Sequence, residues 1–80
     1  MTCIESLLLV ARVYAAATGM KLHSVSWKVF QDSSKLDAVV KGADLVTRRY
    51  EAAMAWFALN WPDHVAWPDD VRRPEVEPAA

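Results

Sequence analysis

The sequence predicts an all-α fold, a small four-helix domain followed by an extended C-terminal tail. Hydrophobic residues make up 54% of the 80 residues, which favours a packed core over a disordered chain. Glycine occurs only twice, while Ala, Leu, Val and Met are abundant, as is typical of helices. The four prolines all lie at or after position 62, so we expect the helical part to end there.

The first helix is predicted from its ends and its periodicity. Thr2 and Glu5 have the spacing of a capping box, in which each side chain accepts a hydrogen bond from a free backbone N–H group of the first turn. Apolar residues then recur every three or four positions. Gly19 is suited to a left-handed helix end, so the helix is predicted over residues 3–18.

Three further helices follow from the same periodicity, separated by polar or glycine-containing segments. They are predicted over residues 22–30, 34–41 and from about 44–47 to 60. Either Asp32 or Ser34 is expected to cap the third helix, and either Asp44 or Thr47 the fourth. No strand, internal repeat or low-complexity segment is expected.

The chain is predicted to divide into a helical domain, residues 1–62, and a proline-rich acidic tail, residues 63–80. The domain carries seven Lys/Arg and five Asp/Glu, a net charge of +2. The tail carries two Arg and five Asp/Glu, a net charge of −3, and is expected to be extended or partly disordered. The mildly basic domain suits a phosphate-bearing partner.

The single cysteine, Cys3, excludes an internal disulfide and gives no zinc ligand set, so a reducing compartment and no metal or other cofactor are expected. The apolar run near the N-terminus does not predict a signal peptide, because Glu5 precedes it and Arg12 interrupts it. No membrane association is expected, because the run from Leu7 to Ala11 is too short to span a bilayer.

Residues 14–31 contain the spacing of a helix-turn-helix. Ala15 is a small residue near the end of the first helix, where two helices cross closely. Gly19, four residues later, suits a turn that a Cβ atom opposes. Val25, six residues further on, is a branched apolar side chain able to pack the second helix against the first.

With these residues, positions 11–30 resemble the helix-turn-helix of phage repressors and of bacterial regulators of the lac-repressor type. The segment SVSWKVFQ resembles the start of their recognition helices. More loosely, residues 2–62 are similar to small prophage-like helix-turn-helix proteins of bacteria, in the AAATG turn and the later TRRYE segment. The resemblance implies a DNA-binding transcriptional regulator of the bacterial cytoplasm or nucleoid.

The resemblance also implies that helix 22–30 enters the major groove of double-stranded DNA. The family's base-facing positions correspond here to Lys21, Leu22, His23, Ser26 and Trp27, with Ser24 and Lys28 on the same surface. The family has a basic donor where Trp27 stands and an apolar residue where Lys28 stands. One explanation is that Trp27 turns inward and Lys28 outward.

Three more basic residues are candidate DNA contacts. Arg48 and Arg49 open the fourth helix, where the helix dipole disfavours cations, and this suggests a phosphate contact. Salt bridges to Asp44 or Glu51 would explain them almost as well. Lys35 is the remaining candidate, and convergence of all these charges beside helix 22–30 would favour DNA binding.

The fourth helix has two apolar stripes, and a small domain needs only one for its core. The second stripe predicts the interface of a homodimer and consists of Ala52, Ala55, Trp56 and Leu59. The rival explanation is that the tail folds back and lays Val65 and Trp67 over this stripe.

The alternative function is a phage-type helical module that binds a host protein through the tryptophan-rich C-terminal part, at Trp56, Trp61 and Trp67. An exposed tryptophan patch would favour this alternative over DNA. No enzyme is expected, because the sequence has no glycine-rich phosphate loop, no nucleophile elbow and no paired His and carboxylate at a catalytic spacing.

Overall fold

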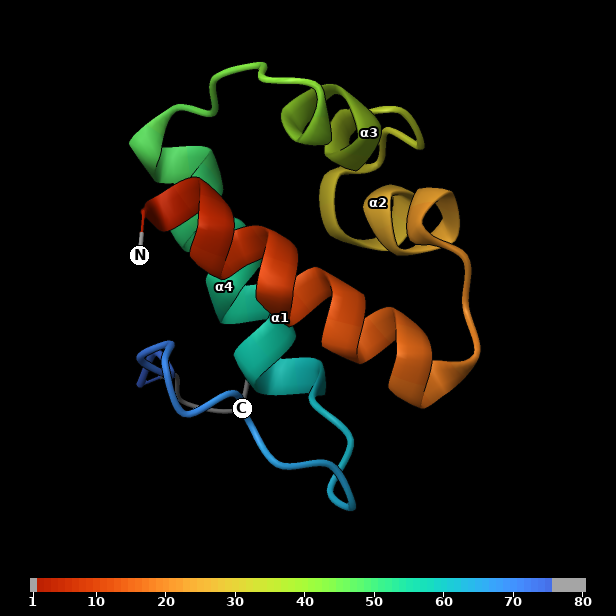
Figure 1. The fold of residues 1–80 in the computed structure, drawn as a ribbon, viewed down its shortest axis with the longest axis vertical. Helices are drawn as coiled ribbons and strands as arrows, with labels where there is room; N and C mark the ends of the chain where they lie inside the picture. Colours follow the sequence, from red (N-terminus) through yellow and green to blue (C-terminus); the bar gives the residue numbers. More distant parts are fainter. Residues whose placement is uncertain (1, 76–80) are drawn as a thin grey trace.

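The computed structural model describes residues 2–75 and confirms the all-α fold class (Figure 1). Four α-helices follow one another, and no strand occurs among residues 2–75. The helices are α1 (Cys3–Thr18), α2 (Leu22–Phe30), α3 (Lys35–Val40) and α4 (Thr47–Asn60). α1 crosses α4, while α2 and α3 pack together at one end of this pair, opposite the C-terminal tail.

The ends of α1 are those that the sequence predicts. Thr2 Oγ1 accepts the Glu5 N–H at 3.1 Å, and Glu5 Oε1 accepts the Thr2 N–H at 3.3 Å, which completes the capping box. At the other end Gly19 is left-handed, with φ 70°, and the N–H of Met20 donates to the carbonyl of Ala15 at 3.0 Å. This left-handed residue turns the chain sharply out of α1.

At the start of α3 the N-cap is Ser34, one of the two predicted residues, although its side chain makes no hydrogen bond to the helix. α3 spans Lys35–Val40, and Asp32 stabilises the preceding turn by accepting both the N–H (2.9 Å) and the Oγ–H (2.7 Å) of Ser34. α4 has Val46 as its N-cap, so the expectation of Asp44 or Thr47 was wrong. Val46 takes extended backbone angles and its carbonyl accepts the N–H of Tyr50, whereas Thr47 is already helical.

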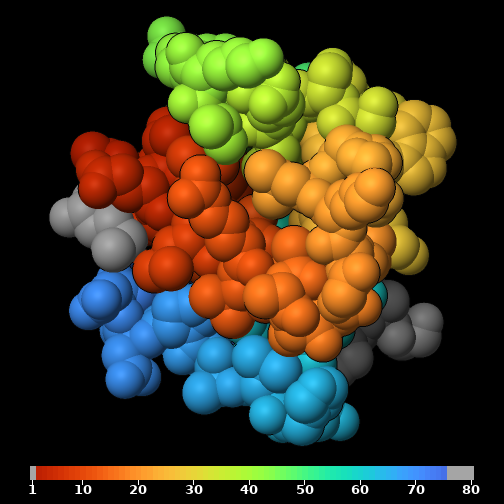
Figure 2. Space-filling view, turned by 45° about the vertical axis from the view of Figure 1, so that its right-hand side comes forward, coloured from red at the N-terminus to blue at the C-terminus, as the bar shows by residue number. Residues whose placement is uncertain are grey.

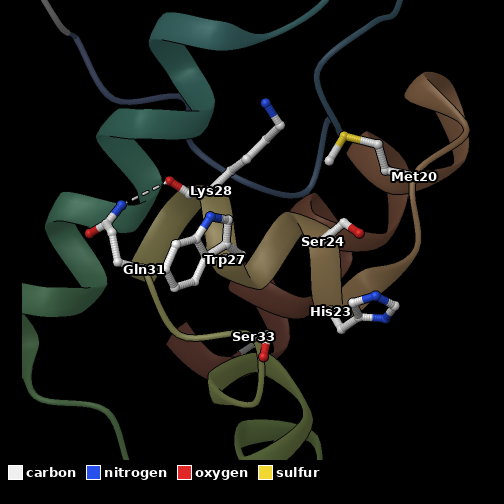
Figure 3. A pocket seen from close by; sticks show the side chains of 7 residues that line it. All are labelled: Met20, His23, Ser24, Trp27, Lys28, Gln31 and Ser33. Carbon is white, nitrogen blue, oxygen red and sulfur yellow. Dashed lines mark hydrogen bonds between the residues drawn. The ribbon is translucent and has the colours of Figure 1, made fainter.

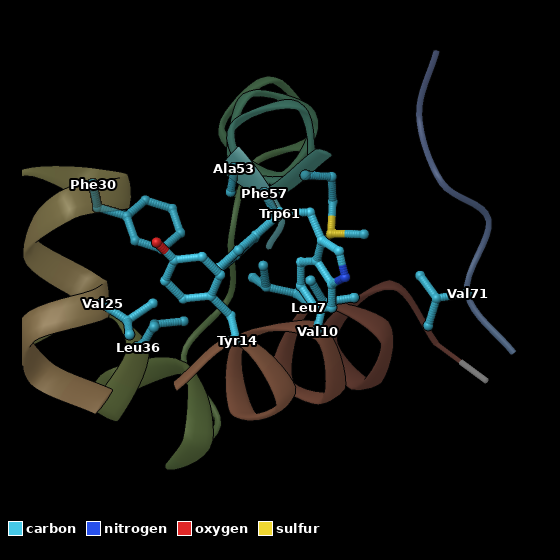
Figure 4. Packing of buried hydrophobic residues seen from close by; sticks show 12 residues of the cluster. Leu7, Val10, Tyr14, Val25, Phe30, Leu36, Ala53, Phe57, Trp61 and Val71 are labelled. Atoms are coloured by element: carbon cyan, nitrogen blue, oxygen red, sulfur yellow. The ribbon is translucent and has the colours of Figure 1, made fainter. Parts of the chain in front are cut away.

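The core is centred on Tyr14, which connects two groups of side chains (Figure 4). On one side lie Val25, Phe30 and Leu36 from the α2–α3 end. On the other side lie residues of α1 together with Trp61 and Val71. The Tyr14 ring meets the rings of Trp56, Phe57 and Trp61 at centroid distances of 5.4, 5.5 and 6.1 Å. All four helices therefore share one hydrophobic core.

The described part of the predicted tail, residues 63–75, contains no helix or strand, makes two tight turns and packs against the domain. Val71 is buried, and the Trp67 ring lies 4.7 Å from that of Trp61. Arg73 stacks on Trp67 at 5.4 Å and donates from its guanidinium to the carbonyl of Ala58 at 2.8 Å. In Figure 2 the tail, in blue, lies along the opposite edge from α3 and the loop after it, in yellow-green. The described part of the tail therefore belongs to the folded domain.

A short tandem repeat explains this packing and corrects the expectation that the chain has none. The segments WPDHV (61–65) and WPDDV (67–71) share the pattern W-P-D-x-V. In each segment the indole Nε1–H of the tryptophan donates to the valine carbonyl at 2.8 Å. The valine N–H donates to the proline carbonyl, at 3.2 Å in the first segment and 3.1 Å in the second. Each tryptophan thus closes its own turn while its ring packs on the core.

Within residues 2–75, no single helix is both long and apolar enough to cross a membrane. α1 and α2 reach such a length only together, and they are bent by 114°.

Candidate functional site

α1 and α2 are joined by a short turn and lie steeply across one another. The chain direction changes by 114° across the three-residue connection, residues 19–21, which matches the usual crossing of about 90–120°. Each of the three spacing residues takes its expected place: Ala15 is half-buried, Gly19 is left-handed and Val25 is fully buried against the core. Because Val25 anchors one face of α2, the opposite face is turned to solvent.

The outward face of α2 borders a shallow hollow of about 630 Å³ (Figure 3). The Trp27 ring lies at its centre, with 59% of the residue exposed, so the explanation in which Trp27 turns inward is wrong. Lys28 is exposed as well. The lining residues are Met20, His23, Ser24, Trp27, Lys28, Gln31 and Ser33. None of them is acidic, so the hollow has a neutral to positive lining.

The N-terminus of α2 also faces solvent. Lys21 is its N-cap residue, is exposed, and makes no side-chain hydrogen bond to the helix. No side chain therefore caps the first turn of α2. Backbone N–H groups at such a helix start, aided by the helix dipole, favour anions. Lys21 and the start of α2 thus extend the positive character of the face.

Ser26 does not belong to this face, and its prediction as a base contact was wrong. It is completely buried. Its Oγ–H donates to the carbonyl of Asp32 at 2.5 Å, and its Oγ accepts the N–H of Leu36 at 3.0 Å. Ser26 therefore holds the α2–α3 connection against α2. Leu22 is half-buried and packs against the core, so it also contributes more to folding than to the outward face.

Two of the remaining basic candidates, Lys35 and Arg49, lie near the far end of α2. The Arg49 guanidinium stacks on the ring of Phe30, the last residue of α2, at 5.6 Å. The pKa of the nearby Asp32 carboxyl is lowered, first by hydrogen bonds from Ser34 and to a smaller extent by the charges of Lys35 and Arg49. Asp32 thus offsets part of the positive charge that Lys35 and Arg49 add at this end.

Arg48 is exposed in the first turn of α4, and the structure gives it no role. Neither Arg48 nor Arg49 forms the salt bridge with Asp44 or Glu51 that the sequence left open; the ion pair among residues 2–75 joins Lys41 and Asp37 at 2.9 Å. The structure thus places Lys21 at the start of α2 and Lys28 in its last turn, both exposed. It places Arg49 beside Phe30 at the end of α2 and leaves Arg48 unassigned.

The predicted dimer stripe on α4 is only partly free. Trp56 packs on Tyr14 and is half-buried, and Ala55 is half-buried too. Ala52 and Leu59 stay exposed, Leu59 at 49%. The tail covers a different part of α4, since Arg73 reaches the Ala58 carbonyl while Leu59 stays open. Of the four residues of the predicted stripe, only Leu59 and Ala52 are therefore exposed and available for pairing.

The tryptophans on which the alternative function depends, Trp56, Trp61 and Trp67, pack within the domain. Trp61 is buried, Trp56 and Trp67 are half-buried, and the indole N–H groups of Trp61 and Trp67 are hydrogen-bonded. They form no exposed tryptophan patch among residues 2–75. The surface on which the protein-partner alternative depended is therefore absent from the described structure.

The sequence missed three residues of the hollow: Met20, Gln31 and Ser33. Gln31 ends α2 in a left-handed conformation, φ 57°, and its Nε2–H donates to the Lys28 carbonyl at 3.1 Å. The signal for Gln31 was its position one helical turn after Trp27. Met20 and Ser33 lie in the loops between helices, where helical periodicity does not predict the direction in which a side chain points.

Among residues 2–75, no three His, Cys, Asp or Glu side chains are placed to hold a metal ion. Comparison with protein-family models, with curated proteins and with solved structures finds no match for this chain.

Proposed function

We propose that this protein binds double-stranded DNA by placing α2 in the major groove, and that it regulates transcription as phage-type repressors do. The observation that supports this proposal best is the outward face of α2. It carries His23, Trp27 and Lys28, and the hollow that it borders has no carboxylate in its lining. Lys21 is exposed as the N-cap residue at the start of the helix. Such a role involves no catalysis and would place the protein with the chromosome, in the cytoplasm or nucleoid of a bacterial cell.

The dimensions of α2 suit this role. Its nine residues span about 13 Å at about 1.5 Å per residue. The major groove is about 12 Å wide, which admits the diameter of an α-helix with its side chains, about 10–12 Å. The free helix start and Lys21 would meet a phosphate, while His23, Ser24 and Trp27 would face base edges. Lys28 and Arg49 would meet the backbone at the other end.

The test is duplex binding as a function of salt. Fluorescence anisotropy with a random-sequence 30-base-pair duplex between 50 and 200 mM NaCl should give a log–log slope of roughly −0.9 per phosphate contacted. Lys28→Ala should weaken binding and make the slope shallower by about one such contact. Lys41→Ala is the matched control, since it removes the same charge from a residue paired with Asp37 at the end of α3. Absence of binding at 50 mM, or equal effects of both variants, would contradict the proposal.

We also propose that two copies pair through the exposed part of α4, because regulators with one helix-turn-helix commonly read two half-sites as two-fold dimers. Leu59, exposed at 49%, and Ala52 are the candidate contacts. Sedimentation at micromolar concentration should show a dimer that Leu59→Lys converts to a monomer. A monomeric wild-type protein would exclude this arrangement and leave α2 to read a single half-site.

A further inference from the structure

Trp27 differs from the other tryptophans because its ring packs on no other aromatic ring among residues 2–75. It leaves 59% of its surface exposed, against 7% for Trp61. Its indole N–H donates to no group among residues 2–75, whereas those of Trp61 and Trp67 donate to backbone carbonyls. A large aromatic side chain stabilises a protein by leaving water, and Trp27 does so only in part. Exposed tryptophans at the centre of a binding face are typical energetic anchors of an interface.

The surroundings of Trp27 define what it meets in the complex. His23 and Gln31 lie one helical turn before and after it, and Lys28 is its neighbour in sequence (Figure 3). These side chains offer hydrogen bonds and positive charge, so Trp27 is the large apolar feature at the middle of the face. A major groove has one apolar feature of its own, the C5-methyl group of a pyrimidine.

We propose that Trp27 contacts a pyrimidine C5-methyl group in the major groove and thereby fixes one position of each binding site as thymine or 5-methylcytosine. This inference rests on the proposed DNA-binding function and assigns its specificity at one position. The flat indole covers the methyl group and removes it from water. A cytosine or uracil at this position has only a hydrogen there and loses that burial.

The test begins with selection of a binding site by the full-length protein from duplexes with 20 randomised base pairs. Each thymine of the selected site is then replaced by deoxyuridine, which removes the methyl group and keeps the base pair and its O4 acceptor. At one position per half-site the wild-type protein should lose about fourfold in affinity, the equivalent of about 0.8 kcal/mol for one buried methyl group. Trp27→Ala should bind the two duplexes equally at that position.

Two further variants complete the experiment. Trp27→Phe keeps an aromatic ring and should retain part of the preference for thymine. Val40→Ala removes another exposed apolar side chain, at the end of α3, and should respond to deoxyuridine as the wild type does. Replacing the same thymine by cytosine and then by 5-methylcytosine separates the methyl group from the rest of the base: 5-methylcytosine should recover affinity relative to cytosine.

The outcomes distinguish failure of the assignment to Trp27 from failure of the proposed DNA binding. If the wild-type protein selects a site but deoxyuridine is neutral at every thymine, or if Trp27→Ala loses affinity as the wild type does, the assignment to Trp27 is overturned while DNA binding stands. Selection of a site that contains no thymine would overturn it in the same way, unless a library with 5-methylcytosine in place of cytosine restores the preference. If no duplex is bound, the proposed function fails as well.

Discussion

The tail end and the α2 end of the molecule use tryptophan in opposite ways. At the tail end, the rings of Trp61 and Trp67 pack against each other with their centroids 4.7 Å apart and their planes tilted by 58°. Each indole N–H closes a W-P-D-x-V turn. At the α2 end, Trp27 projects from a helix whose inner face Val25 already anchors. The tail end thus uses its tryptophans inside the fold, and the α2 end exposes most of a large side chain to solvent.

This difference means that stability and binding are expected to respond to different substitutions. Changes at the tail end should lower the free energy of unfolding. Changes on the outward face of α2 should leave that free energy alone and alter binding. Substitutions that alter both stability and binding would show that the two regions depend on one another.

The largest expected effect is on the free energy of unfolding, and it should separate two tryptophan variants. Trp61→Ala should lower the free energy of unfolding by roughly 3–5 kcal/mol, because it empties a buried site against Tyr14 and Trp67. Trp27→Ala should change it by no more than about 0.5 kcal/mol. Urea unfolding followed by far-ultraviolet circular dichroism measures both. Similar losses for the two variants would mean that Trp27 packs more tightly than its exposure indicates.

Ser26 tests whether every side chain of α2 belongs to the binding face. Ser26→Ala should cost roughly 1–3 kcal/mol, because the buried N–H of Leu36 loses its acceptor. Ser24, half-buried at the hollow, is the matched control, and Ser24→Ala should be nearly neutral for stability. Urea unfolding gives both values, and selection of DNA sites should show an unchanged base preference for Ser26→Ala. A changed preference with unchanged stability would restore Ser26 to the DNA contacts.

Gly19 tests how α2 is held at its angle to α1. A Cβ atom built at Gly19 meets nothing within 4 Å, so the cost of a substitution comes from the left-handed backbone, φ 70°. Gly19→Val should therefore cost about 1–2 kcal/mol, and Gly19→Asn clearly less, because asparagine tolerates this conformation. Thermal unfolding of the three proteins measures the order. Equal stability of all three would indicate that the left-handed turn is not required.

The smallest expected effect is a pH dependence at the start of α1. The pKa of Glu5 is lowered by its hydrogen bonds with Thr2, so the ionised form favours the folded state. This contribution is complete above about pH 4.3, the ordinary glutamate pKa, and is lost as the pH falls through the lower folded pKa. Glu5→Gln keeps the side-chain acceptor without titrating. The wild-type melting temperature should therefore fall slightly more than that of Glu5→Gln between pH 5 and 3.

The helix ends were predictable because their signals are local. Thr2, Glu5 and Gly19 act within four residues of their own positions, and each does what its spacing predicts. Apolar periodicity likewise placed α2 at residues 22–30. Such local rules need no knowledge of what packs against a helix, so one sequence suffices for them.

What the sequence did not predict depends on partners further away. Ser26 faces inward because its hydroxyl joins Asp32 and Leu36, six and ten residues later, and a polar residue on a helix gives no sign of such partners. The W-P-D-x-V repeat was visible as letters. Its structure was not, because an indole that closes its own turn on a backbone carbonyl has no common sequence rule.

Because Trp27 is exposed, its fluorescence should report on the state of the outward face of α2. A small quencher such as acrylamide in water should reach the solvent-facing indole of Trp27 more readily than those of Trp61 and Trp67, which lie against the core. The fraction of tryptophan emission that is easily quenched should therefore come mostly from one residue and disappear in Trp27→Phe. A molecule bound over α2 would shield that residue, so occupancy of this face becomes measurable without a label, whatever the bound molecule is.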